Sequence, residues 1–109
     1  MTTARLFRVT GLVQGVGFRP TVHRIARELA LAGEVFNDAE GVGVILEGPE
    51  EAVLRFPEVL RAQKPPLARI DDVVMTEVPA TGRTEFTITK TKGGRVRTGI
   101  TADAATGQI

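Results

Sequence analysis

The sequence predicts an α+β sandwich in which two helices cover one face of an antiparallel sheet of four or five strands. Three observations support this fold. Two segments carry apolar residues at helical spacing, and each is amphipathic, so each needs a surface to pack against. Short segments with the alternating pattern of strands flank both helices. Turns that contain Pro or Gly separate the elements and give the order β-α-β-β-α-β.

The first predicted strand and the first predicted helix meet at a glycine-rich turn. Residues 5–13 alternate between apolar and polar side chains, as in a strand with one buried face. The helical spacing of apolar residues starts at Phe18, Pro20 opens the predicted helix, and Gly33 is its expected C-terminal stop. Its predicted apolar face consists of Phe18, Val22, Ile25, Ala26, Leu29 and Ala30. Its predicted solvent-facing side consists of His23, Arg24, Arg27 and Glu28.

Four further strands complete the predicted sheet. Residues 34–38 and 42–47 form a hairpin around the turn at residues 39–41. Strands at residues 69–78 and 84–90 follow the second helix. Two amphipathic helices on one face of such a sheet make a ferredoxin-like α/β sandwich.

The second helix is predicted between two proline signals. It begins near Pro49, where acidic residues occupy the first turn, and it ends at Pro65. Its predicted apolar face consists of Val53, Phe56 and Leu60. Pro57 is expected to kink or shorten this helix, because proline removes a backbone hydrogen-bond donor.

Length and composition are those of one small globular domain. The chain has 109 residues, of which 42% are hydrophobic and 25% are charged, and its formal net charge is +1. This balance argues against disorder and provides no overall field to attract nucleic acid or anionic lipid. The chain has no cysteine, which excludes disulfides and thiolate metal sites. No apolar segment is long enough for a membrane span, so we expect a cytoplasmic protein.

The composition changes near residue 90. Residues 91–109 are rich in Thr, Gly, Lys and Arg and poor in apolar residues. We therefore predict a domain at residues 1–90, followed by a linker or tail at residues 91–109. The basic residues of this region are more typical of a solvated linker than of a nucleic-acid contact. They are Lys90, Lys92, Arg95 and Arg97.

The clearest functional pattern lies between Gly11 and Arg19, which reads GLVQGVGFR. A glycine-rich turn between a strand and a helix lets successive backbone N–H groups converge on one point, where the positive helix end favours an anion. Arg19 adds a planar charged group that suits phosphoryl oxygens. The predicted phosphate-binding residues are Gly15, Val16, Gly17, Phe18 and Arg19. From these residues alone, glycines that merely allow a tight turn are an equally good explanation.

Other candidate residues have structural explanations. The glycine spacing fits neither a dinucleotide-binding fingerprint nor a Walker loop. His23 is a single histidine and makes no metal site, so we expect it to be solvated. Asp71 and Asp72 are neighbours on a strand and point to opposite faces, and Asp71 is expected to pair locally. Asp38 is expected to shape the hairpin, and Gln14 to hydrogen-bond across the loop.

Two segments resemble the motifs of the acylphosphatases, which are small ferredoxin-like enzymes. VQGVGFR, ending at Arg19, is similar to the first motif of that family, and GEVFN, ending at Asn37, resembles the second. The resemblance extends over residues 5–90. It implies that Arg19 and the loop amides hold a phosphoryl group, while Asn37 orients the attacking water. Arg19 and Asn37 are therefore the expected catalytic residues.

The second motif departs from the acylphosphatase pattern at two positions. Glu34 stands where that family usually has an aromatic residue, and Asp38 stands where it usually has Thr or Ser. Three other sequence segments resemble the N-terminal domain of HypF more closely. HypF is the carbamoyltransferase that helps make the cyanide ligands of nickel–iron hydrogenases. The three segments are Arg19-Pro20, Phe36-Asn37-Asp38 and PPLARID at residues 65–71. Residues 101–106 resemble the linker before the first zinc-binding cysteine of HypF, which implies further domains in a longer chain.

The resemblance implies hydrolysis of the phosphoryl bond of carbamoyl phosphate or another acyl phosphate, within a carbamoyltransferase of hydrogenase maturation. It implies no metal and no cofactor in this domain. The expected partners are the small-molecule substrate, the remaining HypF domains and a maturation partner protein, with no nucleic acid and no membrane. Two alternatives stay open. One is a module that binds phosphate or carbamoyl phosphate without turnover, and the other is an RNA-binding domain, which the absence of Trp and Tyr disfavours.

Overall fold

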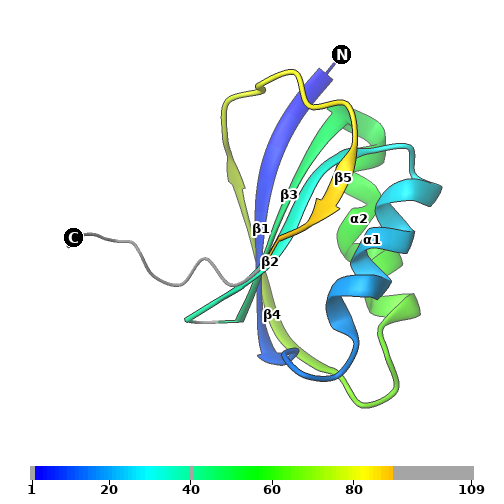
Figure 1. Ribbon diagram of the computed structural model, residues 1–109, viewed down its shortest axis with the longest axis vertical. Coiled ribbons are helices and arrows are strands. Elements are labelled where there is room, and N and C mark those ends of the chain that lie inside the picture. Colours follow the sequence, from blue (N-terminus) through cyan, green and yellow to red (C-terminus); the bar gives the residue numbers. More distant parts are fainter. Residues whose placement is uncertain (1, 40, 90–109) are drawn as a thin grey trace.

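The computed structural model describes residues 2–39 and 41–89, and their elements follow the predicted order (Figure 1). The elements are β1 (Thr2–Leu12), α1 (Phe18–Glu28), β2 (Ala32–Asp38), β3 (Gly41–Pro49), α2 (Glu50–Gln63), β4 (Arg69–Glu77) and β5 (Phe86–Ile88). The ferredoxin-like order and the fifth strand are confirmed. The tail expected at residues 91–109, with its basic residues, lies outside the described residues, and the boundary at residue 90 stays a prediction.

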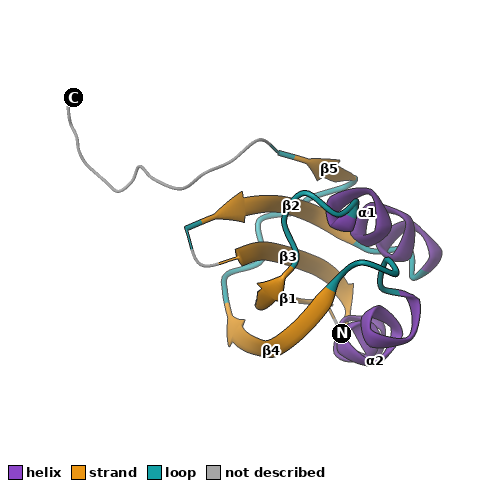
Figure 2. Cartoon of the chain, turned by 90° about the horizontal axis from the view of Figure 1, so that it is seen from below, coloured by secondary structure: helices purple, strands orange, loops and turns teal. Residues whose placement is uncertain are grey.

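The sheet has five strands in the order β4-β1-β3-β2-β5. Both helices lie on the same face of it (Figure 2). The first four strands pair antiparallel, as predicted, whereas β5 pairs parallel to β2. The reason is the connection between β4 and β5, which leaves and re-enters the sheet at the same end (Figure 1). As a result β5 runs opposite to β4, which is the direction of β2.

The core lies between the two helices and the sheet face that they cover. Its helical side chains are Phe18, Val22, Ile25 and Ala26 from α1, and Val53, Phe56 and Leu60 from α2. Its strand side chains include Phe7, Val9, Val35, Val42, Val44 and Leu46. The rings of Phe7 and Phe56 pack at a centroid distance of 5.2 Å. Each large apolar side chain buried in this way contributes about 1.5–3 kcal/mol, so this layer carries most of the stability.

Helix α1 ends earlier than predicted. It stops at Glu28, and the chain then turns at Ala30, whose φ of 58° lies in the left-handed region. Gly33 is therefore not a helix stop but the second residue of β2, with a φ of 141°. A side chain at Gly33 would collide with the carbonyl oxygen of Ile45 on β3. The close approach of two strands requires this glycine, and that approach cannot be seen in the local sequence.

Helix α2 continues through Pro57 without a break. The predicted shortening is wrong, because all 14 residues from Glu50 to Gln63 are helical. Interior proline costs roughly 3 kcal/mol. Buried Val53, Phe56 and Leu60 lie on both sides of the proline, and about 1.5–3 kcal/mol for each of them offsets that cost.

Candidate functional site

The loop between β1 and α1 has the backbone form of an anion cradle. Gly15 and Gly17 have φ values of 75° and 80°, in the left-handed region. Gly17 is the N-cap of α1, where no side chain makes a capping hydrogen bond and no acidic residue occupies the first turn. The first N–H groups of α1 therefore have no acceptor side chain at their cap, and such a helix end suits an anion.

The predicted cradle residues contribute through their backbone. A Cβ at Gly15 or Gly17 would meet no atom within 4 Å, so the positive φ, and not lack of room, calls for glycine at both positions. Val16 packs partly against the core, and Phe18 is buried within it. Only the N–H groups of Val16 and Phe18 are thus suited to bind an anion.

Gln14 attaches this loop to the β2–β3 hairpin. Its Nε2 donates hydrogen bonds to the carbonyl oxygens of Asp38, at 2.8 Å, and Gly41, at 2.7 Å. Gln14 thus forms hydrogen bonds, as expected, but to the neighbouring hairpin and not across its own loop. Since Asp38 directly follows Asn37, the two Gln14 contacts hold the cradle against the end of β2.

Arg19 reaches the end of β5. Its Nη1 donates a hydrogen bond to the carbonyl oxygen of Thr89 at 3.3 Å, across 70 positions of sequence. The N–H of Thr89 in turn donates to the carbonyl oxygen of Val35 on β2 at 2.8 Å. These two bonds place the guanidinium beside the same end of β2 that Gln14 holds.

Asn37 lies at that end of β2, opposite Val42 of β3 and on the face that the helices cover. Its Oδ1 is buried and has no hydrogen-bond partner among the described residues. A buried acceptor without a partner costs about 1–3 kcal/mol, so its burial needs an explanation. The structure brings Asn37, Arg19 and the cradle to one end of the sheet, and their roles stay predictions.

The two positions that depart from the acylphosphatase motif face away from the cradle. Glu34 and Asp38 alternate with Asn37 along β2 and therefore lie on the face opposite the helices. Asp38 forms an ion pair with Arg8. Glu34 Oε1 accepts a hydrogen bond from Thr89 Oγ1 at 3.1 Å.

His23 is not the solvated residue that its helical position suggests. It is half-buried, and its ring packs edge-on against Phe86 of β5 at a centroid distance of 5.8 Å. The cause is β5, which extends the sheet beneath α1 in a way that the helical pattern cannot reveal. His23 also lines a cavity of about 690 Å³ with Arg27 and Glu85, near the C-terminal end of α1.

Asp71 pairs locally, as predicted. Its Oδ1 accepts from Arg69 Nε at 2.9 Å, and this bond raises the pKa of the Arg69 guanidinium. Asp72 Oδ1 accepts from the N–H of Val73 at 2.9 Å. Within residues 2–39 and 41–89, no three His, Cys, Asp or Glu side chains are grouped so that they could hold a metal ion. None of the helices in this part of the chain is both long and apolar enough to cross a membrane.

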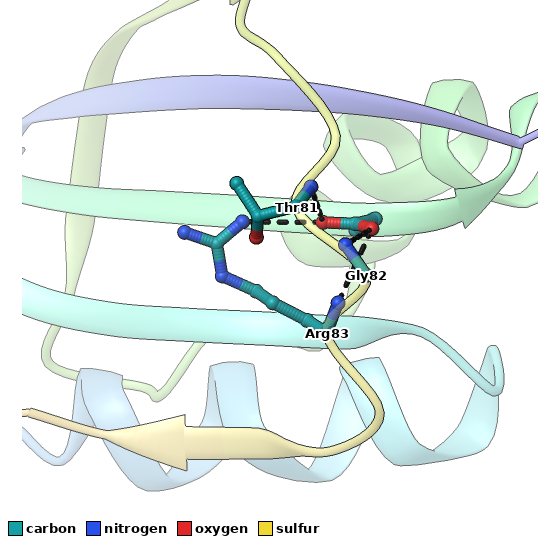
Figure 3. Close-up of polar contacts among 4 residues, drawn as sticks. Thr81, Gly82 and Arg83 are labelled. Carbon is teal, nitrogen blue, oxygen red and sulfur yellow. Dashed lines mark hydrogen bonds and ion pairs between the residues drawn. The ribbon is translucent and has the colours of Figure 1, made fainter.

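Sequence reasoning missed Glu47, a buried carboxylate at the end of β3. It accepts hydrogen bonds from the N–H groups of Thr81, Gly82 and Arg83 at 3.1, 2.7 and 3.3 Å, and from Arg83 Nη1 at 3.2 Å (Figure 3). The bond from Thr81 has the largest effect and lowers the pKa of Glu47, against the opposing effect of burial. The only signal in the sequence is an acidic residue that ends an apolar strand. The four bonds attach the β4–β5 connection to the uncovered sheet face.

The chain has relatives among acylphosphatases and HypF proteins. The acylphosphatase family model matches residues 6–88. Carbamoyltransferase HypF of Rhizobium leguminosarum bv. viciae is 50% identical over 99 residues, which cover 91% of this chain and 13% of that protein. The acylphosphatase of Lactobacillus johnsonii is 40% identical over 83 residues, which cover 74% of this chain and 91% of that protein.

Solved structures agree with these sequence matches. Full-length HypF, in a phosphate- and nucleotide-bound form, superposes with a TM-score of 0.80 at 35% identity and covers 86% of this chain and 13% of that one. Acylphosphatase from Bacillus subtilis superposes with a TM-score of 0.72 at 37% identity, over 82% and 99% of the two chains. The chain thus spans 13% of the length of these HypF proteins. It belongs to the acylphosphatase family and is homologous to the N-terminal domain of HypF carbamoyltransferases.

Proposed function

We propose that this domain hydrolyses the phosphoryl bond of acyl phosphates, with carbamoyl phosphate as its substrate. The observation that carries the proposal is the buried, partnerless Oδ1 of Asn37, at the end of the sheet where Arg19 and the cradle meet. The acylphosphatase relatives support the reaction class, and the carbamoyltransferase relatives support the choice of substrate. The phosphate-bound form of a homologous HypF agrees with a phosphate ligand.

The proposed reaction is attack of water on phosphorus. The backbone N–H groups from Gly15 to Arg19 and the Arg19 guanidinium bind the phosphoryl oxygens and stabilise the charge that spreads over them. Asn37 Oδ1 accepts a hydrogen bond from the attacking water and aligns it with the breaking bond. The water oxygen bonds to phosphorus, the bond from phosphorus to the acyl oxygen breaks, and the acyl group leaves as a carboxylate. The water proton passes to the substrate's own phosphate, so the reaction needs no protein nucleophile and no cofactor.

The relatives support a wider setting for this activity. We place the domain in a carbamoyltransferase that serves hydrogenase maturation in the cytoplasm, where carbamoyl phosphate would yield carbamate and phosphate. Its partners would be the remaining HypF domains and a maturation partner protein. Since the chain spans 13% of its HypF relatives, these roles belong to a longer protein than the domain described.

Phosphate release from carbamoyl phosphate and acetyl phosphate, measured side by side, tests the proposed reaction. Arg19→Ala and Asn37→Ala should each lower turnover by about 10²–10³, the usual effect of removing a group that stabilises a transition state. Arg27→Ala, which changes an exposed arginine at the other end of α1, is the matched control and should retain activity. Unchanged phosphate release by folded Arg19→Ala would overturn the assignment.

Binding without turnover is an alternative function. The two departures from the acylphosphatase motif, Glu34 and Asp38, would favour it if they faced the cradle, but both side chains lie on the sheet face opposite Asn37. Saturable binding of inorganic phosphate by a wild-type domain that releases none from either substrate would favour this alternative.

A further inference from the structure

We propose that Thr89 and Glu34 are positioning residues that hold Arg19 in place for catalysis, an inference that rests on the proposed function. Thr89 lies outside the two motifs that predicted the site, and Glu34 is a position where the second motif departs from the acylphosphatase pattern. Both would act through the Arg19 guanidinium.

Thr89 joins three parts of the molecule with three different groups. Its N–H donates to Val35 on β2 at 2.8 Å, and its carbonyl oxygen accepts from Arg19 Nη1 at 3.3 Å. Its hydroxyl donates to Glu34 Oε1 at 3.1 Å. The residue is half-buried and directly follows β5. Thr89 thus connects the guanidinium on one side of β2 to a carboxylate on the other.

This connection matters because β5 itself is weakly held. The strand has three residues, and among the described strands it pairs with β2 alone. The Thr89–Glu34 bond adds a side-chain attachment just beyond the last paired residue, at the point where the carbonyl faces Arg19. A long arginine side chain loses rotamer entropy when it is fixed in one position. A carbonyl acceptor that is already in position reduces the part of this cost that falls on the transition state.

Glu34 is placed to hold Thr89 without contacting substrate. It lies on the uncovered face of β2, opposite Ile45 of β3, whereas Asn37 lies on the helix-covered face. Glu34 is also one of the two departures from the acylphosphatase motif. Loss of its acceptor oxygen should therefore remove the same hydrogen bond as loss of the Thr89 hydroxyl.

The first experiment compares phosphate release by Thr89 variants. Thr89→Val removes the hydroxyl and keeps the shape, and it should lower kcat about 3–10-fold, as expected for one hydrogen bond, with KM changed less than about twofold. Thr89→Ser restores the donor and should restore kcat. Thr87→Val is the matched control, because Thr87 is exposed on the same face of β5 and its side chain has no hydrogen bond among the described residues. Glu34→Ala removes the same hydrogen bond and should lower kcat at least as much as Thr89→Val, whereas Glu34→Gln keeps an acceptor oxygen and should lower kcat less.

The second experiment separates positioning from general support of the fold. In an Arg19→Ala background, Thr89→Val should cause no further loss of activity, because the guanidinium that it positions is gone. An equal loss in both backgrounds, or a Thr89→Ser variant as impaired as Thr89→Val, would overturn the inference.

A third measurement is independent of turnover. The heteronuclear NOE of the Arg19 Nε–Hε group reports the mobility of the guanidinium on the picosecond to nanosecond timescale. It should fall in Thr89→Val and stay unchanged in Thr87→Val. If the wild type released no phosphate, the proposed function would fail, and this NOE would still decide whether Thr89 holds Arg19. An unchanged NOE in Thr89→Val would refute the positioning role even in an active enzyme.

Discussion

Both ends of the β2–β3 hairpin bring together N–H groups and an arginine that suit an anion, but at only one end does a carboxylate of the described chain accept from them. At one end, the carboxylate of Glu47 accepts three backbone N–H groups and a guanidinium N–H from Arg83. At the other end, backbone N–H groups and a guanidinium, that of Arg19, surround no carboxylate of the described chain, and the oxygen of Asn37 is buried without a partner. In both places N–H groups and an arginine suit an anion.

The difference between the ends distinguishes a structural site from a functional one. Where the chain supplies its own anion, the result is an attachment that holds the β4–β5 connection. Where it supplies none, we expect the anion to come from the substrate. Substitutions that alter the charge at each end test this comparison.

The largest effect is expected for Asn37→Asp, which gives the cradle end a carboxylate of its own. Two like charges 4 Å apart repel by about 4 kcal/mol at an effective dielectric constant of about 20, so we expect phosphate release to fall about 10²–10³-fold. Activity is compared per folded molecule, because an ionised carboxyl at a buried position also costs stability. Ala39→Asp adds the same charge at an exposed position of the hairpin turn and should cost at most a few-fold. Activity near wild type in Asn37→Asp would contradict the view that the cradle end takes its anion from the substrate.

The second effect is expected at the other end, for Glu47→Gln. The substitution removes the charge from a buried group with four hydrogen bonds, so the urea midpoint should fall clearly at pH 7, while residual activity per folded molecule changes little. Glu77→Gln, at an exposed position of β4, is the control.

The pH dependence of this loss follows from the lowered pKa of Glu47. A carboxyl whose pKa is lower in the folded state than in the unfolded state stabilises the fold fully above the unfolded value and loses this contribution as pH falls through the folded value. The difference in urea midpoint between wild type and Glu47→Gln should therefore be constant above the ordinary pKa of 4.5 and shrink below it. A difference that grows on acidification would contradict this account.

The smallest effect is expected for Gln14→Ala, which detaches the cradle loop from the hairpin. Two hydrogen bonds to backbone carbonyls are lost, one of them exposed, so we expect kcat/KM to fall only about 3–10-fold. Gln63→Ala, a change of a half-buried glutamine whose exposed hydrogen bond joins Arg24, serves as the control. A loss as large as that of Arg19→Ala would mean that Gln14 contacts the substrate directly.

Much of the fold follows from local pattern. The apolar faces of both helices are buried as their spacing predicts, apart from the end of α1, and the glycines before α1 have the positive φ that a tight turn requires. The exceptions share a cause. Gly33 and His23 were misassigned because neighbouring strands contact them, β3 in the case of Gly33 and β5 in the case of His23.

The sequence by itself determined the order of elements and the cradle turn, and its resemblance to the acylphosphatases implied which residues act. The order and the turn depend on residues within one helical turn or one strand, so nearby positions specify them. Only the tertiary structure decided that Asn37 Oδ1 is buried with no partner among the described residues, that Arg19 donates to Thr89, and that Glu47 has its hydrogen bonds satisfied. All three depend on how distant strands pair and where the β4–β5 connection crosses the sheet. The packing of the whole domain sets these long-range contacts, so local sequence patterns do not predict them.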